Sequence, residues 1–253
     1  MKMVAIEGGT FEMGSTVAEI ERYLEIFAYA FRQFSRERAR SWFLKQTPKV
    51  RQTVAAFDLA KYLVTNADFQ SFEESVFGKV LKANPARPDH PVQGVSFVDS
   101  LGYCQWLSQS TGETFRLPTE AEWEFAASSR GTSIFPWGDE FQRGRANTQE
   151  EGIGDTTPVG AFPAGASAQG IMDLGGNVEE WTQSIYLPYP NASYIADDIT
   201  EDTGHCYPIA RGGAYAMSGD LCLASRRHGY RPNYTIVGFR VARSRRFQPT
   251  PGA

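Results

Sequence analysis

The sequence contains few of the residues that most often build metal and redox centres. Its 253 residues include only three cysteines and three histidines. An odd number of cysteines excludes a disulfide framework, although a single bridge is compatible with the count. The histidines, His90, His205 and His228, lie far apart and lack the short spacing typical of zinc ligands. The sequence therefore predicts neither a disulfide-stabilised protein nor a zinc protein.

Long apolar runs and clusters of one charge are also missing. No apolar run approaches the length of a membrane helix, about 18 residues, so we expect no membrane partner. The net charge is only −4, and no lysine and arginine cluster indicates a nucleic-acid partner. At the start of the chain, apolar residues 4–6 are followed at once by Glu7 and two glycines, which is not a secretory pattern. We therefore expect a cytoplasmic protein.

Common catalytic motifs are absent as well. There is no Gly-x-Ser-x-Gly turn and no phosphate-binding loop, and Gly8-Gly9 alone indicates only a turn. No repeat or low-complexity segment divides the chain, and the hydrophobic share of 42% supports a sizeable core. We therefore expect one domain over residues 1–246, with a frayed tail at 247–253.

Four capping patterns predict helices. Thr16 and Glu19 form a capping box before apolar residues spaced by four and three, which predicts an amphipathic helix within a helical excursion at 16–45. The apolar positions are Ile20, Leu24, Phe27, Phe31 and Phe34. Caps at Thr65, Ser96 and Thr119 predict three more helices. We expect Phe69, Phe72 and Val76 to point inward, the third helix to end near residue 108, and Cys104 to be a small core residue.

The remaining sequence favours strands and loops. Residues 4–13 alternate loosely between apolar and polar and end at Gly14, which suits an opening strand. From Gly131 onward, glycine, proline, asparagine and aspartate are frequent and the periodicity is poor. That pattern predicts long ordered loops with short strands.

Seven segments together resemble the formylglycine-generating enzyme family, also called sulfatase-modifying factors. They follow the family's order and lie at residues 8–15, 57–66, 90–97, 116–124, 136–139, 175–181 and 238–240. The resemblance implies an α+β protein with the C-type-lectin-like fold of that family, with few helices, short strands and long ordered loops. It does not by itself imply the reaction, because function depends on the site rather than the scaffold.

The resemblance also implies structural calcium, an ion that prefers six to eight oxygen ligands. At the first family site the ligands would be the side chains of Asp173 and Glu180 and the carbonyls of Gly176 and Val178. At the second they would be Asn147, the carbonyl of Thr148, Glu151 and the carbonyl of Ile153, with Asp155 able to replace Glu151. The alternative is that these acids only hydrogen-bond their own loops.

The redox site that the resemblance implies is incomplete. Catalytic members bind copper through two cysteines five residues apart, since soft thiolates suit Cu(I). The Arg-Gly-Gly frame at 211–213 puts the first cysteine at Met217 and the second at Cys222. Other family residues are replaced by Ala214, Ser218, Leu221 and Glu179. Because a thioether cannot supply a reactive thiolate, we expect no copper and no formylglycine-generating activity.

Residues 215–237 are rich in tyrosine and arginine, a composition typical of recognition surfaces. The candidate contacts are Tyr215, Met217, Asp220, Arg227, Tyr230 and Arg231. We expect them to surround a concavity with Met217 and Cys222 towards its floor, and to bind an unidentified protein, peptide or small molecule. In the alternative, Arg226 and Arg227 pair with nearby acids and the tyrosines pack on the loops.

Two further functions stay open at this point. An oxygen-dependent oxidoreductase could reuse the family pocket with Cys222 alone. Variable proteins diversified by a reverse transcriptase also have this fold. Their variable segment lies between an Arg-Gly-Gly and a terminal Gly-Phe-Arg, as residues 211–240 do here.

Overall fold

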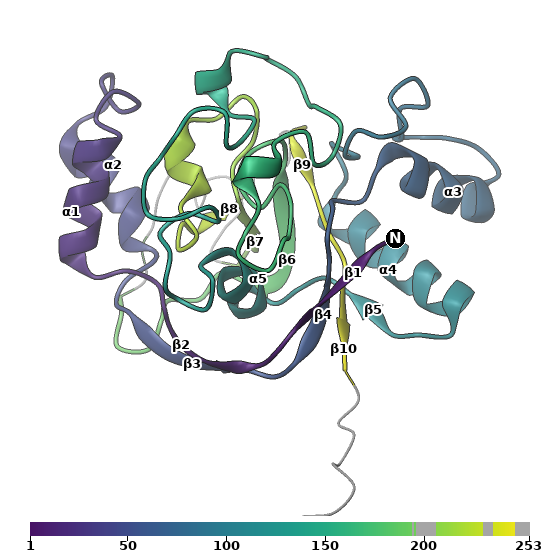
Figure 1. Ribbon diagram of the computed structural model, residues 1–253, viewed down its shortest axis with the longest axis horizontal. Helices are drawn as coiled ribbons and strands as arrows, with labels where there is room; N and C mark the ends of the chain where they lie inside the picture. The colour runs from purple at the N-terminus through teal and green to yellow at the C-terminus, as the bar shows by residue number, and fades with distance from the viewer. Residues whose placement is uncertain (194, 196–205, 230–234, 246–253) are drawn as a thin grey trace, which may run out of the picture.

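Helices and short strands alternate along the chain in an α+β fold, as expected (Figure 1). The computed structural model describes residues 1–193, 195, 206–229 and 235–245. In chain order the described elements are β1 (Met3–Ile6), β2 (Gly9–Met13), α1 (Val17–Ile26), α2 (Arg36–Leu44), β3 (Val50–Val54), β4 (Phe57–Ala60), α3 (Asn66–Phe77), α4 (Phe97–Thr111), β5 (Phe115–Arg116), α5 (Glu120–Ala127), the 3₁₀ turns η1 (Gln149–Glu151) and η2 (Pro163–Gly165), β6 (Glu179–Ile185), β7 (Pro208–Arg211), the 3₁₀ turn η3 (Gly219–Cys222), β8 (His228–Gly229), β9 (Val237–Gly238) and β10 (Ala242–Ser244).

Three sheets connect distant parts of the sequence. The first has the order β1-β4-β10-β5, in which β4 pairs antiparallel with both β1 and β10. The second is the β2–β3 ribbon, and the third has the order β8-β7-β6-β9 with β6 and β9 parallel. Helices α1 and α2 lie on one side of the sheets and α3 and α4 on the other (Figure 1). The first sheet thus joins the beginning of the chain to its end.

The opening strand is interrupted, so the single strand expected at 4–13 is wrong. β1 and β2 are separated by Glu7 and Gly8 and belong to different sheets. A Cβ atom at Gly8 would lie 2.5 Å from the carbonyl oxygen of Val54. Only glycine allows the two backbones to approach this closely, and the chain turns between sheets at that point.

All four capping boxes or caps are present at the expected residues. Thr16, Thr65, Ser96 and Thr119 each accept a hydrogen bond from the backbone N–H three residues later. The first helix is shorter than expected, because α1 ends at Ile26 and a second helix starts after the Ser35 cap. The intervening turn lets aromatic rings pack on α2 instead of extending α1; Phe34 lies 4.9 Å from Trp42 between ring centroids.

The core confirms most of the expected inward residues. Phe69 and Phe72 of α3 and Cys104 of α4 are buried in one cluster, together with Phe239, which directly follows β9. Val76 was expected there but is 49% exposed, because α3 ends one residue later.

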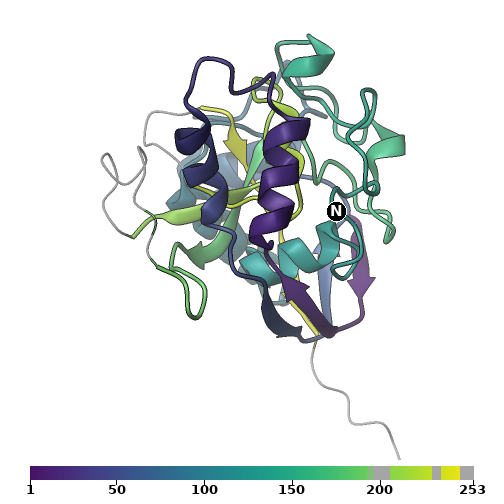
Figure 2. The same cartoon turned by 90° about the vertical axis from the view of Figure 1, so that its left-hand side faces the viewer.

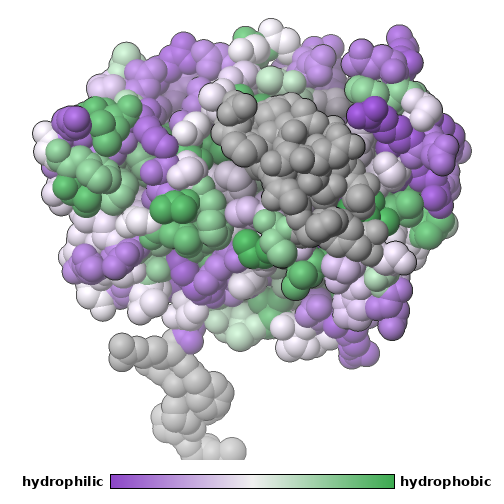
Figure 3. Space-filling model, turned by 180° about the vertical axis from the view of Figure 1, so that it is seen from behind, coloured by the Kyte–Doolittle hydropathy of each residue, from purple (hydrophilic) through white to green (hydrophobic). Residues whose placement is uncertain are grey.

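Exposed apolar residues gather on the α3 and α4 side, at the left edge of Figure 3. Within the described residues no helix is long and apolar enough to cross a membrane.

The segment between α5 and β6 is the long ordered loop region that the sequence predicted. In residues 128–178 the only helical elements described are the two short turns η1 and η2. Backbone contacts hold it to the rest of the protein. For example, the N–H of Gly176 donates to Gly212, and the N–H of Asn177 donates to Asn147. This region lies directly beside the end of β7, where the candidate site begins.

Candidate functional site

The Arg-Gly-Gly frame forms a tight turn at the end of β7. Gly212 and Gly213 have φ values of 97° and 71°, which glycine adopts readily. A Cβ atom at Gly213 would lie only 2.8 Å from the Cβ of Leu221. The turn therefore packs closely against η3. Positions 217 and 222, which the resemblance assigns to the two cysteines, lie on the segment between this turn and the end of η3.

Cys222 lies in the apolar core rather than in an open pocket. Its exposed fraction is 0%, and it belongs to a cluster with Phe27, Phe43 and Phe135. Burial raises the pKa of its thiol well above the ordinary value, and the nearby charges of Glu150 and Asp220 raise it further. A thiol that is buried and protonated is a poor nucleophile and a poor metal ligand.

The α1–α2 helical segment covers this region. Phe27 at the end of α1 packs against Phe135 and Phe141, with ring centroids 6.2 and 5.4 Å apart. The Tyr29 hydroxyl donates to Glu150 at 2.6 Å, and the same carboxylate oxygen accepts the N–H of Gly219 at 2.9 Å. Through Glu150, the first residues of η3 are therefore fixed to the segment at 16–45. The helices of that segment, α1 and α2, face the viewer in Figure 2.

Polar pairs occupy the positions around the turn. Glu179 is fully buried and lies 2.8 Å from Nδ1 of His228. The Ser218 hydroxyl donates to Asp220, which also pairs with Arg226 at 3.6 Å. Burial raises the pKa of Asp220, while Arg226 opposes the rise. Glu179 and Asp220 thus each have a partner within the protein.

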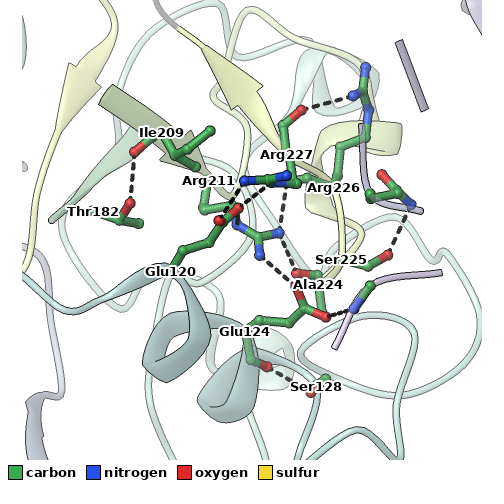
Figure 4. Close-up of polar contacts among 12 residues, drawn as sticks. Glu120, Glu124, Ser128, Thr182, Ile209, Arg211, Ala224, Ser225, Arg226 and Arg227 are labelled. Atoms are coloured by element: carbon green, nitrogen blue, oxygen red, sulfur yellow. Dashed lines mark hydrogen bonds and ion pairs between the residues drawn. The ribbon is translucent and has the colours of Figure 1, made fainter. Parts of the chain in front are cut away.

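A network of ion pairs fixes the segment that follows η3 (Figure 4). Arg227 donates two hydrogen bonds to Glu120, at 2.8 and 3.0 Å. Arg211 donates to Glu124 at 2.5 Å and lies 3.3 Å from Glu120. All four side chains are buried. The sequence left open that Arg226 and Arg227 pair with nearby acids, but it did not identify the partners Glu120 and Glu124, which lie on α5, far away in sequence.

The expected recognition residues do not form one exposed set. Arg227 is 2% exposed and Asp220 is 3% exposed, so the expectation that they contact a ligand is wrong. Their charges are satisfied by internal partners, as the structural alternative required. Tyr215 and Met217 are half-buried and Ala216 is exposed. Tyr230 and Arg231 lie outside the described residues.

Comparison with known proteins shows the family and the fold. The family model described as "Sulfatase-modifying factor enzyme 1-like domain" matches residues 1–245. The chain belongs to the sulfatase-modifying factor family. Its fold is similar to that of PvdO from Pseudomonas aeruginosa, with a TM-score of 0.68 and 24% identity over 95% of this chain and 93% of that one.

Two curated relatives, which have different names and are much longer than this chain, illustrate the range of proteins similar to it. The serine/threonine-protein kinase pkn1 of Chlamydia caviae is 30% identical over 96% of this chain and 38% of its own length. The protein named "Inactive C-alpha-formylglycine-generating enzyme 2" of Mus musculus is 42% identical over 39% of this chain and 33% of its own. The chain therefore spans less than two-fifths of the length of each of these relatives.

The first calcium site of the sulfatase-modifying factor family is a poor fit here. Both carboxylate oxygens of Glu180 accept hydrogen bonds from Arg240, at 2.5 and 2.8 Å, and both side chains are fully buried. Asp173 accepts the N–H of Gly160 at 2.7 Å. A guanidinium thus already neutralises Glu180, and a divalent ion there would have to displace it. Gly176 and Val178 are buried beside these acids.

The second calcium site of the sulfatase-modifying factor family fits better. The side-chain oxygen of Asn147 and the hydroxyl of Thr148 are buried without a hydrogen-bond partner in the structure. Glu151 is close in sequence and accepts the N–H of Gly144, whereas Asp155 pairs with Arg87. Ile153 is 48% exposed, so its backbone is close to the surface. Within the described residues no group of three or more His, Cys, Asp or Glu could hold a metal ion, so any ion there would depend on amide, hydroxyl and carbonyl oxygens.

Proposed function

We propose that this chain is a non-catalytic sulfatase-modifying factor domain that recognises a protein, peptide or small ligand at the surface around residues 214–218. The observation that carries the proposal is the state of Cys222. Its thiol is completely buried in an apolar cluster under α1, and position 217, where the resemblance puts the partner cysteine, is methionine. The chain therefore lacks the second thiolate that a copper–dithiolate centre needs, and the burial of Cys222 leaves oxygen and substrate no access to the first.

The replaced positions support loss of the reaction rather than a small adjustment of it. Glu179 pairs with His228, and the Ser218 hydroxyl bonds Asp220, which also pairs with Arg226, so these side chains are engaged within the protein. A family relative whose name describes it as inactive indicates that the scaffold can persist without formylglycine generation. These contacts stabilise the turn and would hold an exposed loop rigidly, which reduces the entropic cost of binding.

The exposed part of the turn is the proposed contact surface. Tyr215 and Met217 are half-buried and flank the exposed Ala216. Gly213 and the hydrogen bond from Gln149 to the carbonyl of Met217, at 2.9 Å, hold the turn in one shape. Tyrosine and methionine are well suited to such contacts, because tyrosine buries a large rigid ring and the flexible thioether chain of methionine adapts to the partner. The buried Asp220 supports this surface through the Ser218 hydroxyl, whereas Arg227 is paired with Glu120 in the interior. Neither would contact the ligand.

Calcium is proposed only as a structural ion. The oxygens of Asn147, Thr148 and Glu151 would hold it in the 147–153 loop, which contacts the turn through Gln149. The ion would supply a fixed positive charge that orders this loop. It would have no part in any reaction.

The experiment that tests loss of the reaction is a Cu(I) titration against a competing chelator, followed by incubation with a cysteine peptide of the sulfatase type. We expect no stoichiometric Cu(I) binding and no oxidation of the peptide. Stoichiometric binding that disappears in Cys222→Ser would overturn the non-catalytic assignment and would support an oxidoreductase that uses Cys222.

Recognition is tested by selecting a phage-displayed random peptide library on the immobilised protein. We expect the enriched peptides to bind Tyr215→Ala and Met217→Ala variants at least about tenfold more weakly, with little change in melting temperature. The matched control is Val98→Ala, which changes an apolar residue, 74% exposed, on α4. Absence of enrichment, or enriched peptides that bind the turn variants as well as the control, would contradict the proposed surface.

A further inference from the structure

A polar cavity of about 330 Å³ lies between α1, the C-terminal end of α5 and the loop at 131–139. We call it the α1–α5 cavity. Glu12 of β2, Gly14 just after it and Lys49 just before β3 complete its wall, at the place where α1 rises from the β2–β3 ribbon in Figure 2. Met217 and Cys222 do not line it, so it is separate from the turn described above. Its volume is at the lower end of the ~300–1,000 Å³ of ligand pockets, which suits a small ligand.

The buried end of the α1–α5 cavity has polar groups held in fixed positions. Glu124 is 2% exposed and accepts the N–H of Gly14 at 2.6 Å while pairing with Arg211. The Ser225 hydroxyl lies 2.8 Å from that of Ser15. Because these partners come from the turn after β2, from β7 and from the segment after η3, the groups are arranged before any ligand arrives. Such preorganisation lowers the cost of binding.

The exposed end of the cavity has charges of both signs that do not neutralise each other. Arg22 on α1 has no ion pair within the described part of the chain, and neither does Glu12 on β2. Asp139 uses one oxygen to accept the N–H of Ile134 at 3.1 Å, and no described cation pairs with it. Lys49, by contrast, is paired with Glu19 at 2.6 Å. One wall therefore offers an available guanidinium, and the other walls offer available carboxylates.

We propose that the α1–α5 cavity binds a small zwitterion, namely a free α-amino acid or a dipeptide with an uncharged polar side chain. The ligand carboxylate pairs with Arg22, whose planar guanidinium suits a two-point contact. The ligand ammonium pairs with Asp139 and Glu12. At the buried end the hydroxyls of Ser128 and Ser225 already have partners within the protein. Each, donating one bond and accepting one, keeps one lone pair, which accepts an N–H or O–H from the ligand's polar side chain.

Other ligand classes fit this lining less well. A phosphate or other multiply charged anion would meet the carboxylates of Glu12, Glu124 and Asp139 as well as Arg22. An apolar ligand would remove water from those carboxylates without replacing their hydrogen bonds, which is costly. A ligand with one charge of each sign satisfies both walls of the cavity at once.

The test uses the whole chain and titration calorimetry with L-glutamine and glycyl-L-glutamine, which distinguish a free amino acid from a dipeptide. A panel of the other common amino acids is tested in parallel by thermal shift. We expect saturable binding of at least one of these zwitterions. N-acetyl-L-glutamine lacks the ammonium and L-glutamine amide lacks the carboxylate, so each should bind at least about tenfold more weakly than L-glutamine if both walls are used.

Two variants assign the contacts to the cavity. Arg22→Gln removes the guanidinium, and Asp139→Asn removes the carboxylate charge but keeps an oxygen that accepts the Ile134 N–H. Each should weaken binding about tenfold or more, while the exposed control variants Arg32→Gln and Glu140→Gln should not. The proposal is overturned if no amino acid or dipeptide binds, if the charge-blocked analogues bind equally well, or if both cavity variants retain full affinity. None of these results bears on the surface at 214–218.

Discussion

Arg227 and Glu120 form a two-point ion pair in the protein interior, with Nε–Oε1 and Nη2–Oε2 distances of 2.8 and 3.0 Å across 107 residues of sequence. Glu120 begins α5, and Arg227 follows the turn that contains position 222. The pair therefore ties the end of the family's site segment to the helix before the long loops. The guanidinium of Arg227, which we expected from the sequence to contact a ligand, is therefore already paired within the protein.

Removal of this arginine should destabilise the fold strongly. Arg227→Ala would leave Glu120 buried with only the more distant Arg211, and breaking a buried pair costs about 3–5 kcal/mol. Urea denaturation monitored by circular dichroism measures the loss. The control is Arg87→Ala, because Arg87 and Asp155 are both more than 40% exposed and such surface pairs contribute about 0–1 kcal/mol. Equal losses in the two variants would contradict the structural role of Arg227.

Only one of the three cysteines should react with iodoacetamide in the folded protein. Cys206 is exposed, whereas Cys104 and Cys222 are buried. Burial raises the pKa of Cys104 to about 12, so about one thiol in a thousand is ionised at pH 9, and the pKa of Cys222 is raised as well. Mass spectrometry should find one fast label between pH 7 and 9, and three labels in urea. Cys206→Ser should remove the fast label, and rapid labelling of Cys222 in that variant would refute its burial.

Phe27 should protect Cys222 from reagents. Phe27→Ala removes a fully buried ring that packs against Phe135 and Phe141, and such truncations cost about 3–5 kcal/mol. Labelling of Cys222 should then become faster, because local opening of the α1 end is easier. Ile26→Ala, which truncates the neighbouring residue at 38% exposure, is the control and should change neither stability nor labelling much. A Phe27→Ala variant with unchanged Cys222 labelling would contradict coverage by α1.

Calcium should raise the melting temperature through the 147–153 loop. An ion that binds only the folded state stabilises it by about 2.7 kcal/mol at a hundredfold excess over Kd. Differential scanning calorimetry with calcium and with chelator measures the effect. Glu151→Gln keeps an oxygen for the Gly144 N–H but lowers the charge of the ligand set, so it should reduce the shift, whereas the exposed Glu140→Gln should not. A shift that persists in Glu151→Gln but disappears in Asp173→Asn would assign the ion to the first site instead.

Local signals in the sequence determined the starts of the helices and the nature of the loops. Thr16, Thr65, Ser96 and Thr119 cap helices where their patterns predicted, because capping depends on residues only three positions apart. The seven motifs, which follow one another in the order typical of the family, indicated the fold and the family. Helix ends were less certain: the apolar spacing continued to Phe34, but α1 stops at Ile26 since the following aromatic rings pack on α2.

The candidate site shows the limits of that information. Sequence alone determined that position 217 is methionine and that the arginines and tyrosines gather at 215–237. Only the tertiary structure decided that Arg227 faces Glu120, that Arg240 faces Glu180, and that Cys222 lies under α1. These partners are far apart in sequence. Whether a charged side chain is exposed or buried depends on such long-range packing, because a buried charge is tolerated only where a distant segment supplies its opposite.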